Sequence, residues 1–156
     1  MQRLVLLAPL ALIACSGGAS SIQPGQWEMT TSFTTVEAPG MPEAALKAMQ
    51  SQMGQAQTHS SCITPEQAAN PAGDIMKGGS GGQGCQATDS TFSGGNISVH
   101  MSCPGPGGGS MNMAWEGHYT ATTMEGQFTT EVQGGPQSMR MVGTMSGRRT
   151  GDCTSS

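Results

Sequence analysis

Apolar and polar residues alternate in five stretches of the chain, which is the period-two pattern of strands with one buried face. The stretches are residues 26–36, 97–103, 111–120, 124–133 and 139–145. In each of them apolar side chains occupy one side of the strand, while Thr, Ser, Gln and Glu dominate the other. A sheet with one apolar face and one polar face is therefore predicted, with a single layer covering the apolar face.

Turn-forming residues separate these stretches. They lie at 94–95, 104–109, 122–123 and 134–136. Short connections favour hairpins between strands that follow one another, so the second half of the chain is predicted to be an antiparallel meander. In the hairpin around 104–109 the predicted register places Cys103 opposite Ser110. His100 then faces Met113 in the same hairpin.

A helix is predicted over residues 45–52, where good helix formers follow Met41-Pro42-Glu43. Leu46, Met49 and Met53 share one stripe of this helix, and Gly54 ends it. The stripe suggests that the helix packs on the apolar face of the sheet. A short strand over 57–63 and a helical turn over 65–69 follow, with Thr64 as the N-cap of that turn.

These elements together predict an α+β fold in one exported domain, residues 22–156. The fold is mostly an antiparallel β-meander, as a curved sheet or partial barrel, with one amphipathic helix packed on the apolar face.

The amino-terminal segment is typical of a secretory signal. Residues 4–13 are an apolar run after Arg3, about half of the roughly 20 residues that span a bilayer. Leu12-Ile13-Ala14-Cys15 resembles the lipobox of bacterial lipoproteins, in which the cysteine takes a diacylglyceryl group and cleavage precedes it. We therefore expect a signal peptide at 1–14, a lipidated tether at 15–21 and lipid on Cys15. The alternative is an ordinary signal peptide cut near Ala19.

Lipid on Cys15 predicts a protein anchored on a membrane and facing the periplasm, because several acyl chains give stable anchoring. By the same resemblance, Ser16 after the lipidated cysteine favours the outer membrane over the inner one, where Asp is the retention signal. The net charge of −4 and the absence of a basic run beyond Arg148-Arg149 exclude nucleic acid as a partner. No protein partner is indicated.

Four cysteines remain once Cys15 is assigned to lipid: Cys62, Cys85, Cys103 and Cys153. An even number in an oxidising compartment predicts two disulfides, for which three connectivities are possible. A turn at 94–95 favours Cys85 with Cys103, although the parity then requires a bulge or a longer turn. Cys62 would pair with Cys153. A four-cysteine zinc site is the alternative, but the spacing lacks the paired CxxC arrangement of such sites.

Several blocks of the sequence resemble the domain of unknown function 3617 family. They are residues 24–28 (Pro-Gly-Gln-Trp-Glu), 41–42 (Met-Pro), 62–66 (Cys-Ile-Thr-Pro-Glu) and 147–153 (Gly-Arg-Arg-Thr-Gly-Asp-Cys), and they cover the chain from 22 to 153. The resemblance implies a short exported or lipidated protein of Gram-negative bacteria. It implies no activity and no catalytic residue, and it supports disulfide pairing of the four cysteines. Asp152 can pair with one of the two arginines in the last block.

Catalysis is not expected. His59, His100 and His118 are not predicted to converge, since His100 and His118 would lie about 17 Å apart along the predicted hairpin. No nucleophile-elbow, zinc-protease or phosphate-loop motif is present. The chain is predicted to be a non-enzymatic envelope lipoprotein with an accessory or binding role, without a cofactor.

Two binding alternatives remain. Met111-Asn112-Met113 and Met139-Arg140-Met141 are Met-x-Met pairs whose thioethers suit monovalent copper, although methionine as a core filler is the favoured interpretation. A meander under a helix can also carry a small hydrophobic ligand, which a tightly filled core would argue against.

Overall fold

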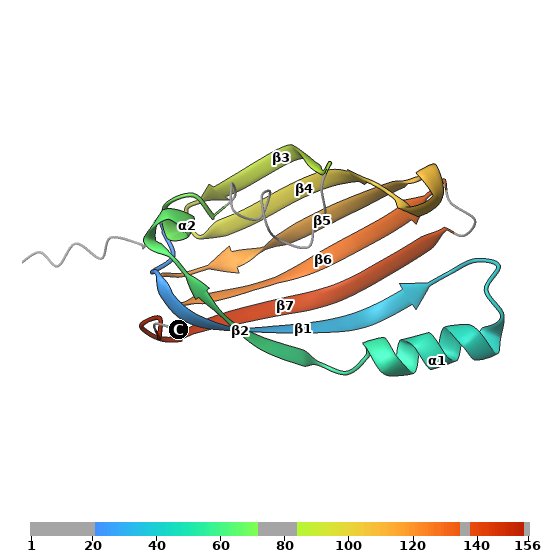
Figure 1. The fold of residues 1–156 in the computed structure, drawn as a ribbon, viewed down its shortest axis with the longest axis horizontal. Coiled ribbons are helices and arrows are strands. Elements are labelled where there is room, and N and C mark those ends of the chain that lie inside the picture. The colour runs from blue at the N-terminus through green and yellow to red at the C-terminus, as the bar shows by residue number, and fades with distance from the viewer. Residues whose placement is uncertain (1–20, 72–83, 135–137, 155–156) are drawn as a thin grey trace, which may run out of the picture.

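The computed structural model describes residues 21–71, 84–134 and 138–154. Within these residues a seven-stranded antiparallel sheet has the strand order β2-β1-β7-β6-β5-β4-β3 (Figure 1). The strands are β1 (Gly25–Glu37), β2 (Gln57–Ile63), β3 (Gln86–Ser93), β4 (Asn96–Pro104), β5 (Ser110–Tyr119), β6 (Thr123–Gln133) and β7 (Met139–Gly151). The helices are α1 (Glu43–Met53) and α2 (Pro65–Ala69).

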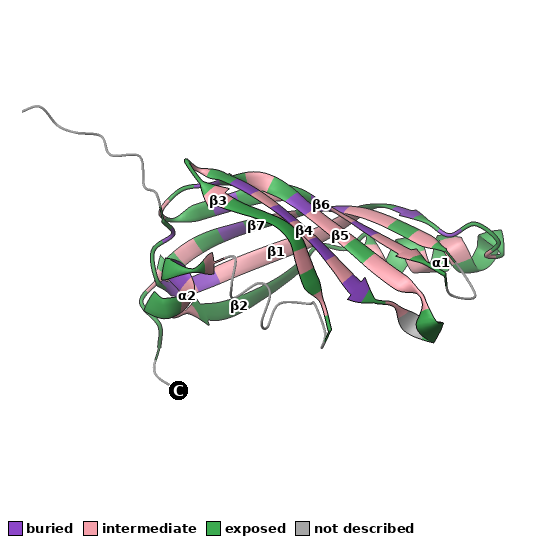
Figure 2. Ribbon diagram, turned by 90° about the horizontal axis from the view of Figure 1, so that it is seen from above, coloured by how far each residue is buried: buried purple, intermediate pink, exposed green. Residues whose placement is uncertain are grey.

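The predicted meander is confirmed for β3 to β7, each of which pairs with the next along the chain. β1 pairs with β7 rather than with a strand close to it in sequence. β2 and β3 are the two edges of the sheet, so the sheet is open and not a closed barrel. Buried and more exposed positions alternate along the strands, as the sequence pattern indicated (Figure 2).

The predicted register of the β4–β5 hairpin was wrong by one residue. Cys103 lies opposite Met111, and His100 lies opposite Ala114. In the observed register Met101 faces Met113, so apolar residues pair with apolar ones. In the connection between β4 and β5, the N–H of Gly105 donates to the carbonyl of Gly109 at 2.8 Å. A one-residue slip would move every side chain of β5 to the other face of the sheet, which is why burial selects this register.

The predicted packing of α1 on the apolar face is not confirmed. No residue of α1 is buried, and the helix contacts β1. β2 pairs only with Gly25–Thr31, so the remainder of β1 has β7 as its single partner strand. α1 lies beside this part of β1, along the edge that has no partner strand (Figure 1). There Gln50 Nε2 donates to the carbonyl of Val36 at 3.0 Å. An amphipathic helix can cover a strand edge as well as a sheet face. In this fold the free edge of β1 presents backbone N–H and C=O groups without a partner strand, and α1 covers that edge.

Two short segments contribute to the core where α1 was expected. Ile22 precedes β1 and Ala68 belongs to α2, and both are buried in the main apolar cluster. Thr64 caps the start of α2: its hydroxyl accepts from the N–H of Gln67, while the Gln67 side chain accepts from the N–H of Thr64. This capping box confirms the predicted N-cap and orients a helix of only five residues.

Glycines on the apolar face give the core its shape. A Cβ added at Gly126 would lie 2.8 Å from Trp115 Nε1, and one added at Gly143 would overlap the ring of Phe128. A Cβ at Gly147 would meet Met29 from one side and Met124 from the other. The neighbouring side chains therefore lie flat over the glycines, which fills a thin core without many Leu or Ile residues.

Two disulfides hold the sheet, in the connectivity that the sequence favoured. Cys62 in β2 bonds Cys153 after β7, with a Cα–Cα distance of 5.5 Å. Cys85 before β3 bonds Cys103 in β4, with a Cα–Cα distance of 4.0 Å. The parity problem of the second pair is solved by a bulge between Ala87 and Asp89.

Candidate functional site

The cysteine expected to carry lipid, Cys15, lies outside the described residues, as do the signal peptide at 1–14 and residues 15–20 of the tether. The described chain begins at Ser21, which is exposed, and Ile22, which is buried. Lipidation of Cys15 therefore stays a prediction.

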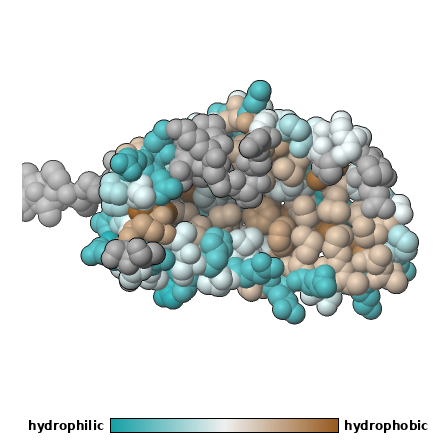
Figure 3. All heavy atoms as spheres, in the orientation of Figure 1, coloured by the Kyte–Doolittle hydropathy of each residue, from teal (hydrophilic) through white to brown (hydrophobic). Residues whose placement is uncertain are grey.

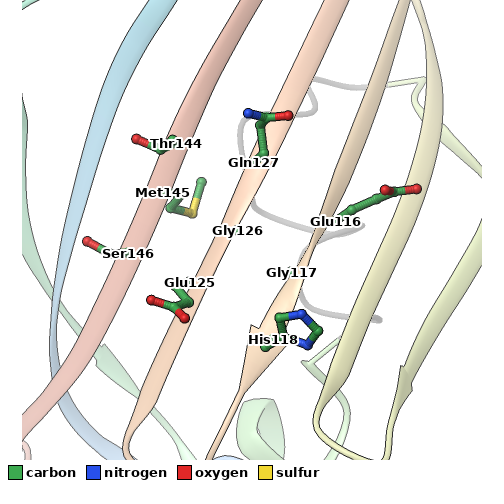
Figure 4. Close-up of a pocket in the computed structure, with 9 residues that line it drawn as sticks. All are labelled: Glu116, Gly117, His118, Glu125, Gly126, Gln127, Thr144, Met145 and Ser146. Atoms are coloured by element: carbon green, nitrogen blue, oxygen red, sulfur yellow. The ribbon is translucent and has the colours of Figure 1, made fainter.

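Two shallow hollows lie on the polar face in the described part of the sheet. The larger, of about 540 Å³, lies over the β5–β6 pair, where Gly117 is opposite Gly126 (Figure 4). Polar side chains surround it: Glu116, His118, Glu125, Gln127, Thr144 and Ser146. The second, of about 340 Å³, lies beside His100 and Asn112. Both hollows are lined largely by polar side chains of the sheet's outer face.

The three histidines lie on three different strands of the sheet. His118 Nδ1 is 3.0 Å from Asn96 Oδ1, and His100 Nε2 is 3.9 Å from Glu116 Oε1. In the observed register His100 faces Ala114, so His118 is four residues further along β5, about 14 Å away at about 3.4 Å per residue. This replaces the separation of about 17 Å predicted from the wrong register. His59 lies on the edge strand β2.

Among the described residues no three or more His, Cys, Asp or Glu side chains are placed to hold a metal ion. The arginines of the family-like ending form ordinary surface pairs. Arg149 Nη2 is 2.5 Å from Asp152 Oδ1, as the sequence suggested, and Arg148 Nη2 is 2.8 Å from Glu28 Oε1. Both pairs are exposed ion pairs that join residues of β1 and β7 or neighbouring residues near the end of β7.

The apolar face is covered unevenly. At the end near α2, Trp27 is 0% exposed, and Ile97 and Tyr119 are buried with it. At the opposite end, five apolar side chains of β5, β6 and β7 are only partly buried. We call these five residues the methionine patch: Met111, Met113, Val132, Met139 and Met141. Figure 3 shows apolar residues gathered at this end of the sheet.

Strand register brings both Met-x-Met pairs into the methionine patch. Met111 faces Val132, which faces Met139 on its other side. Met113 faces Thr130, which faces Met141. The sequence predicted that each pair shares one side of its strand, and the structure confirms it. The sequence did not predict that the two pairs face each other across β6, because this depends on the order and register of three strands.

Charge is kept off the methionine patch. Arg140, between Met139 and Met141, points to the other face of β7, where its Nε is 3.4 Å from Glu131 Oε1. Its Nη1 is 3.9 Å from Glu37 Oε2. On the apolar face Thr130 is polar and yet only 5% exposed, and it lies between Met113 and Met141. The patch is thus a sulfur-rich surface without a charged side chain of its own.

One buried polar atom on the apolar face is unpaired. Trp115 is 8% exposed, and its Nε1 has no hydrogen-bond partner among the described residues. A buried donor without an acceptor is costly, so this N–H lowers the stability that the core provides.

These features define a class of protein with a small, open antiparallel sheet. A disulfide joins each edge strand or its flank to the rest of the fold, and the apolar face is buried at one end and partly exposed at the other. The family model described as Protein of unknown function (DUF3617) matches residues 22–153, and the chain belongs to this family. No curated protein and no solved structure matches the chain. In the part of the chain that is described, no helix has the length and apolar character needed to cross a bilayer.

Proposed function

We propose that this chain is a lipid-anchored protein of the cell envelope with a non-catalytic binding role, and that the methionine patch is its binding surface. The observation that carries the proposal is the uneven cover of the apolar face. At the end near α2, Ile22 and Ala68 are buried in the core cluster, whereas every residue of the patch on the same face is partly exposed. Contiguous exposed apolar surface on a folded protein marks a site of interaction.

Two features support the envelope location: the lipobox-like segment and the disulfide bonds. The lipobox-like Leu12-Ile13-Ala14-Cys15 precedes the sheet, and the four remaining cysteines all form disulfides. Disulfides persist in oxidising compartments such as the bacterial periplasm. Ser16 favours the outer membrane over the inner one by resemblance to lipoprotein sorting signals.

The non-catalytic role is supported by the separation of the reactive groups. The histidines are spread over β2, β4 and β5, and His118 is held by Asn96. A general base and a nucleophile must lie within hydrogen-bond reach of each other. In the described part of the chain, the His118 side chain lies 3.0 Å from Asn96 Oδ1 and the His100 side chain lies 3.9 Å from Glu116 Oε1.

Metabolic labelling with palmitate tests the anchor. We expect the unmodified chain to incorporate the label and to fractionate with membranes. Cys15→Ser should lose both properties, because the thioether can form only on a cysteine sulfur. Ser16→Ala is the matched control and should keep the label. Labelled Cys15→Ser protein would contradict the proposed anchor.

Oxidative footprinting tests the binding surface. Peroxide converts accessible methionines to sulfoxides, and mass spectrometry measures the conversion at each position. If a ligand or partner covers the methionine patch in the envelope, its four methionines should oxidise more slowly in intact cells than in purified protein. Met49 and Met53 of α1, which are also partly exposed, are the internal reference. Equal protection of the patch and the α1 methionines would contradict a binding role for the patch.

A carrier of a small hydrophobic ligand is the second candidate, with the unpaired Trp115 Nε1 as a donor on the same face. Such a ligand must displace side-chain packing to reach this atom, because a Cβ added at Gly126 would already lie 2.8 Å from it. Native mass spectrometry of protein purified in mild detergent tests this candidate. A carrier should retain an extractable molecule with an apolar chain and an acceptor oxygen, and Trp115→Phe should weaken retention. Ligand-free protein would contradict the carrier.

A further inference from the structure

We propose that the methionine patch binds monovalent copper, Cu(I), through the thioether sulfurs of Met111, Met113, Met139 and Met141. The inference rests on the proposed function, since it assigns a ligand class to the same binding surface. The observation behind it is the convergence of two Met-x-Met pairs that are far apart in sequence.

The backbone places the four methionines at the corners of one small rectangle. Each Met pair lies on a strand next to β6, and neighbouring strands are about 4.8 Å apart. The two methionines of a pair are two residues apart, about 7 Å along the strand. Within the plane of the sheet, the four α-carbons therefore lie about 6 Å from the midpoint between Thr130 and Val132. The side chains of Thr130 and Val132 rise on the same face between the two Met pairs, so the four sulfurs must meet above them. The unbranched methionine side chain has three rotatable bonds with which to tilt its sulfur toward that place.

The chemistry of the patch selects a soft monovalent ion. Thioethers are neutral, soft ligands that suit Cu(I), whereas carboxylates and water suit hard divalent ions. Charged groups near the patch are turned to the opposite face, where Arg140 pairs with Glu131. Cys103 lies beside Met111, but it is bonded to Cys85 and offers no thiolate. Thioethers are therefore the donors that the patch itself offers.

Partial burial is also consistent with a site that an ion can enter. The four methionines of the patch are each partly exposed, as are Met29 and Met145, whereas Met101 and Met124 on the same face are buried. Met29 packs over Gly147 toward Met124, although its cross-strand neighbour on β2 is His59. The sulfur of Met29 is thereby turned away from His59, so this pair does not make a competing Met–His site.

Anaerobic titration with Cu(I) against a chromophoric Cu(I) chelator tests the proposal on the full chain isolated in detergent. Ascorbate keeps copper reduced without opening the disulfides, and free thiols are counted first because a thiolate would bind Cu(I) itself. We expect one Cu(I) per chain. Met113→Leu and Met141→Leu should each weaken binding at least about ten-fold, since each removes a direct ligand.

Leucine keeps the volume and apolar character of methionine, so these variants should remain folded. Met49→Leu and Met53→Leu on α1 are matched controls and should leave the affinity unchanged. The proposal is overturned if no Cu(I) is held against the chelator, or if replacing all four patch methionines by leucine leaves binding intact.

A second measurement needs no variant. With 13C-labelled methionine methyl groups, adding Cu(I) or Ag(I) should shift the signals of the four patch methionines and leave those of Met29 and Met124 in place. Shifts confined to other methionines would overturn the site. If copper fails both measurements while the patch is still protected in intact cells, the binding surface stands and its ligand is of another class.

Discussion

Gln50 of α1 donates a hydrogen bond from Nε2 to the backbone carbonyl of Val36 in β1, at 3.0 Å. This contact lies where β1 extends beyond β2 and would otherwise expose its edge. Unpaired strand edges promote pairing with other chains, and natural proteins cover them with helices or loops. α1 thus protects an edge, which explains why none of its residues is buried.

Replacing Gln50 by Ala should lower the free energy of unfolding by about 0.5–1.5 kcal/mol, the net worth of one hydrogen bond. It should also raise the rate of aggregation, because the carbonyl of Val36 becomes available to another chain. Urea denaturation and light scattering measure the two effects. Gln52→Ala, at an exposed position of the same helix, is the control. Equal behaviour of the two variants would show that α1 does not protect the edge.

Gly126→Ala should destabilise the fold by about 1–3 kcal/mol, as overpacking of a filled core does. The added Cβ would lie 2.8 Å from Trp115 Nε1 and would overlap the backbone of Glu116. The matched control is Gly151→Ala in β7, where an added Cβ meets nothing within 4 Å. The control should change stability by less than about 0.5 kcal/mol. Thermal unfolding of both variants tests whether side chains lie flat on the glycines as described.

The two disulfides should contribute unequally to stability. Cys62–Cys153 closes a loop with a sequence separation of 91 residues, whereas Cys85–Cys103 spans 18. By the chain-entropy model the longer loop contributes about 4–5 kcal/mol and the shorter about 3 kcal/mol. Replacing each pair by alanines and measuring unfolding in urea gives the comparison.

Amide hydrogen exchange locates the effect of each bridge. Without Cys62–Cys153, exchange should accelerate most in β2, because this edge strand has only β1 beside it. A uniform acceleration over all seven strands would instead indicate that the bridge acts only on the unfolded chain.

Thr64→Ala should lower the free energy of unfolding by about 0.5–2 kcal/mol, the usual cost of losing an N-cap. The substitution removes the acceptor for the N–H of Gln67, and α2 carries the buried Ala68. Thr64→Ser keeps the hydroxyl and should retain most of the stability. Chemical denaturation of both variants gives the comparison, and similar losses would mean that the cap contributes little.

Local patterns in the sequence account for much of the fold. Alternation identifies β1 and β4 to β7, and turn residues identify the hairpins between β4 and β7. The parity of Cys85 and Cys103 even requires the bulge that the structure has between Ala87 and Asp89. The same bulge interrupts the alternation of β3, so the sequence gives no bounds for that strand.

Other features depend on relationships that no local pattern contains. The stripe of Leu46, Met49 and Met53 has the same spacing whether α1 covers a face or an edge, so its position was predicted wrongly. The β4–β5 register was also missed by one residue, since it depends on the geometry of the connection around Gly105. For the methionine patch, the sequence gives the parity of each Met pair, while their meeting across β6 requires the register of three strands.

Because β7 lies between β1 and β6, its position limits the order in which the strands can pair during synthesis. Glu28 meets Arg148, 120 residues later in the chain, so the first strand has no inner neighbour until the last one has been synthesised. A chain that stops before residue 139 would leave β1 and β2 as an antiparallel pair that is not attached to the meander. Long-range pairing of this kind is slow and follows the local hairpins. The amino-terminal part, next to the predicted anchor, is therefore expected to join the fold last.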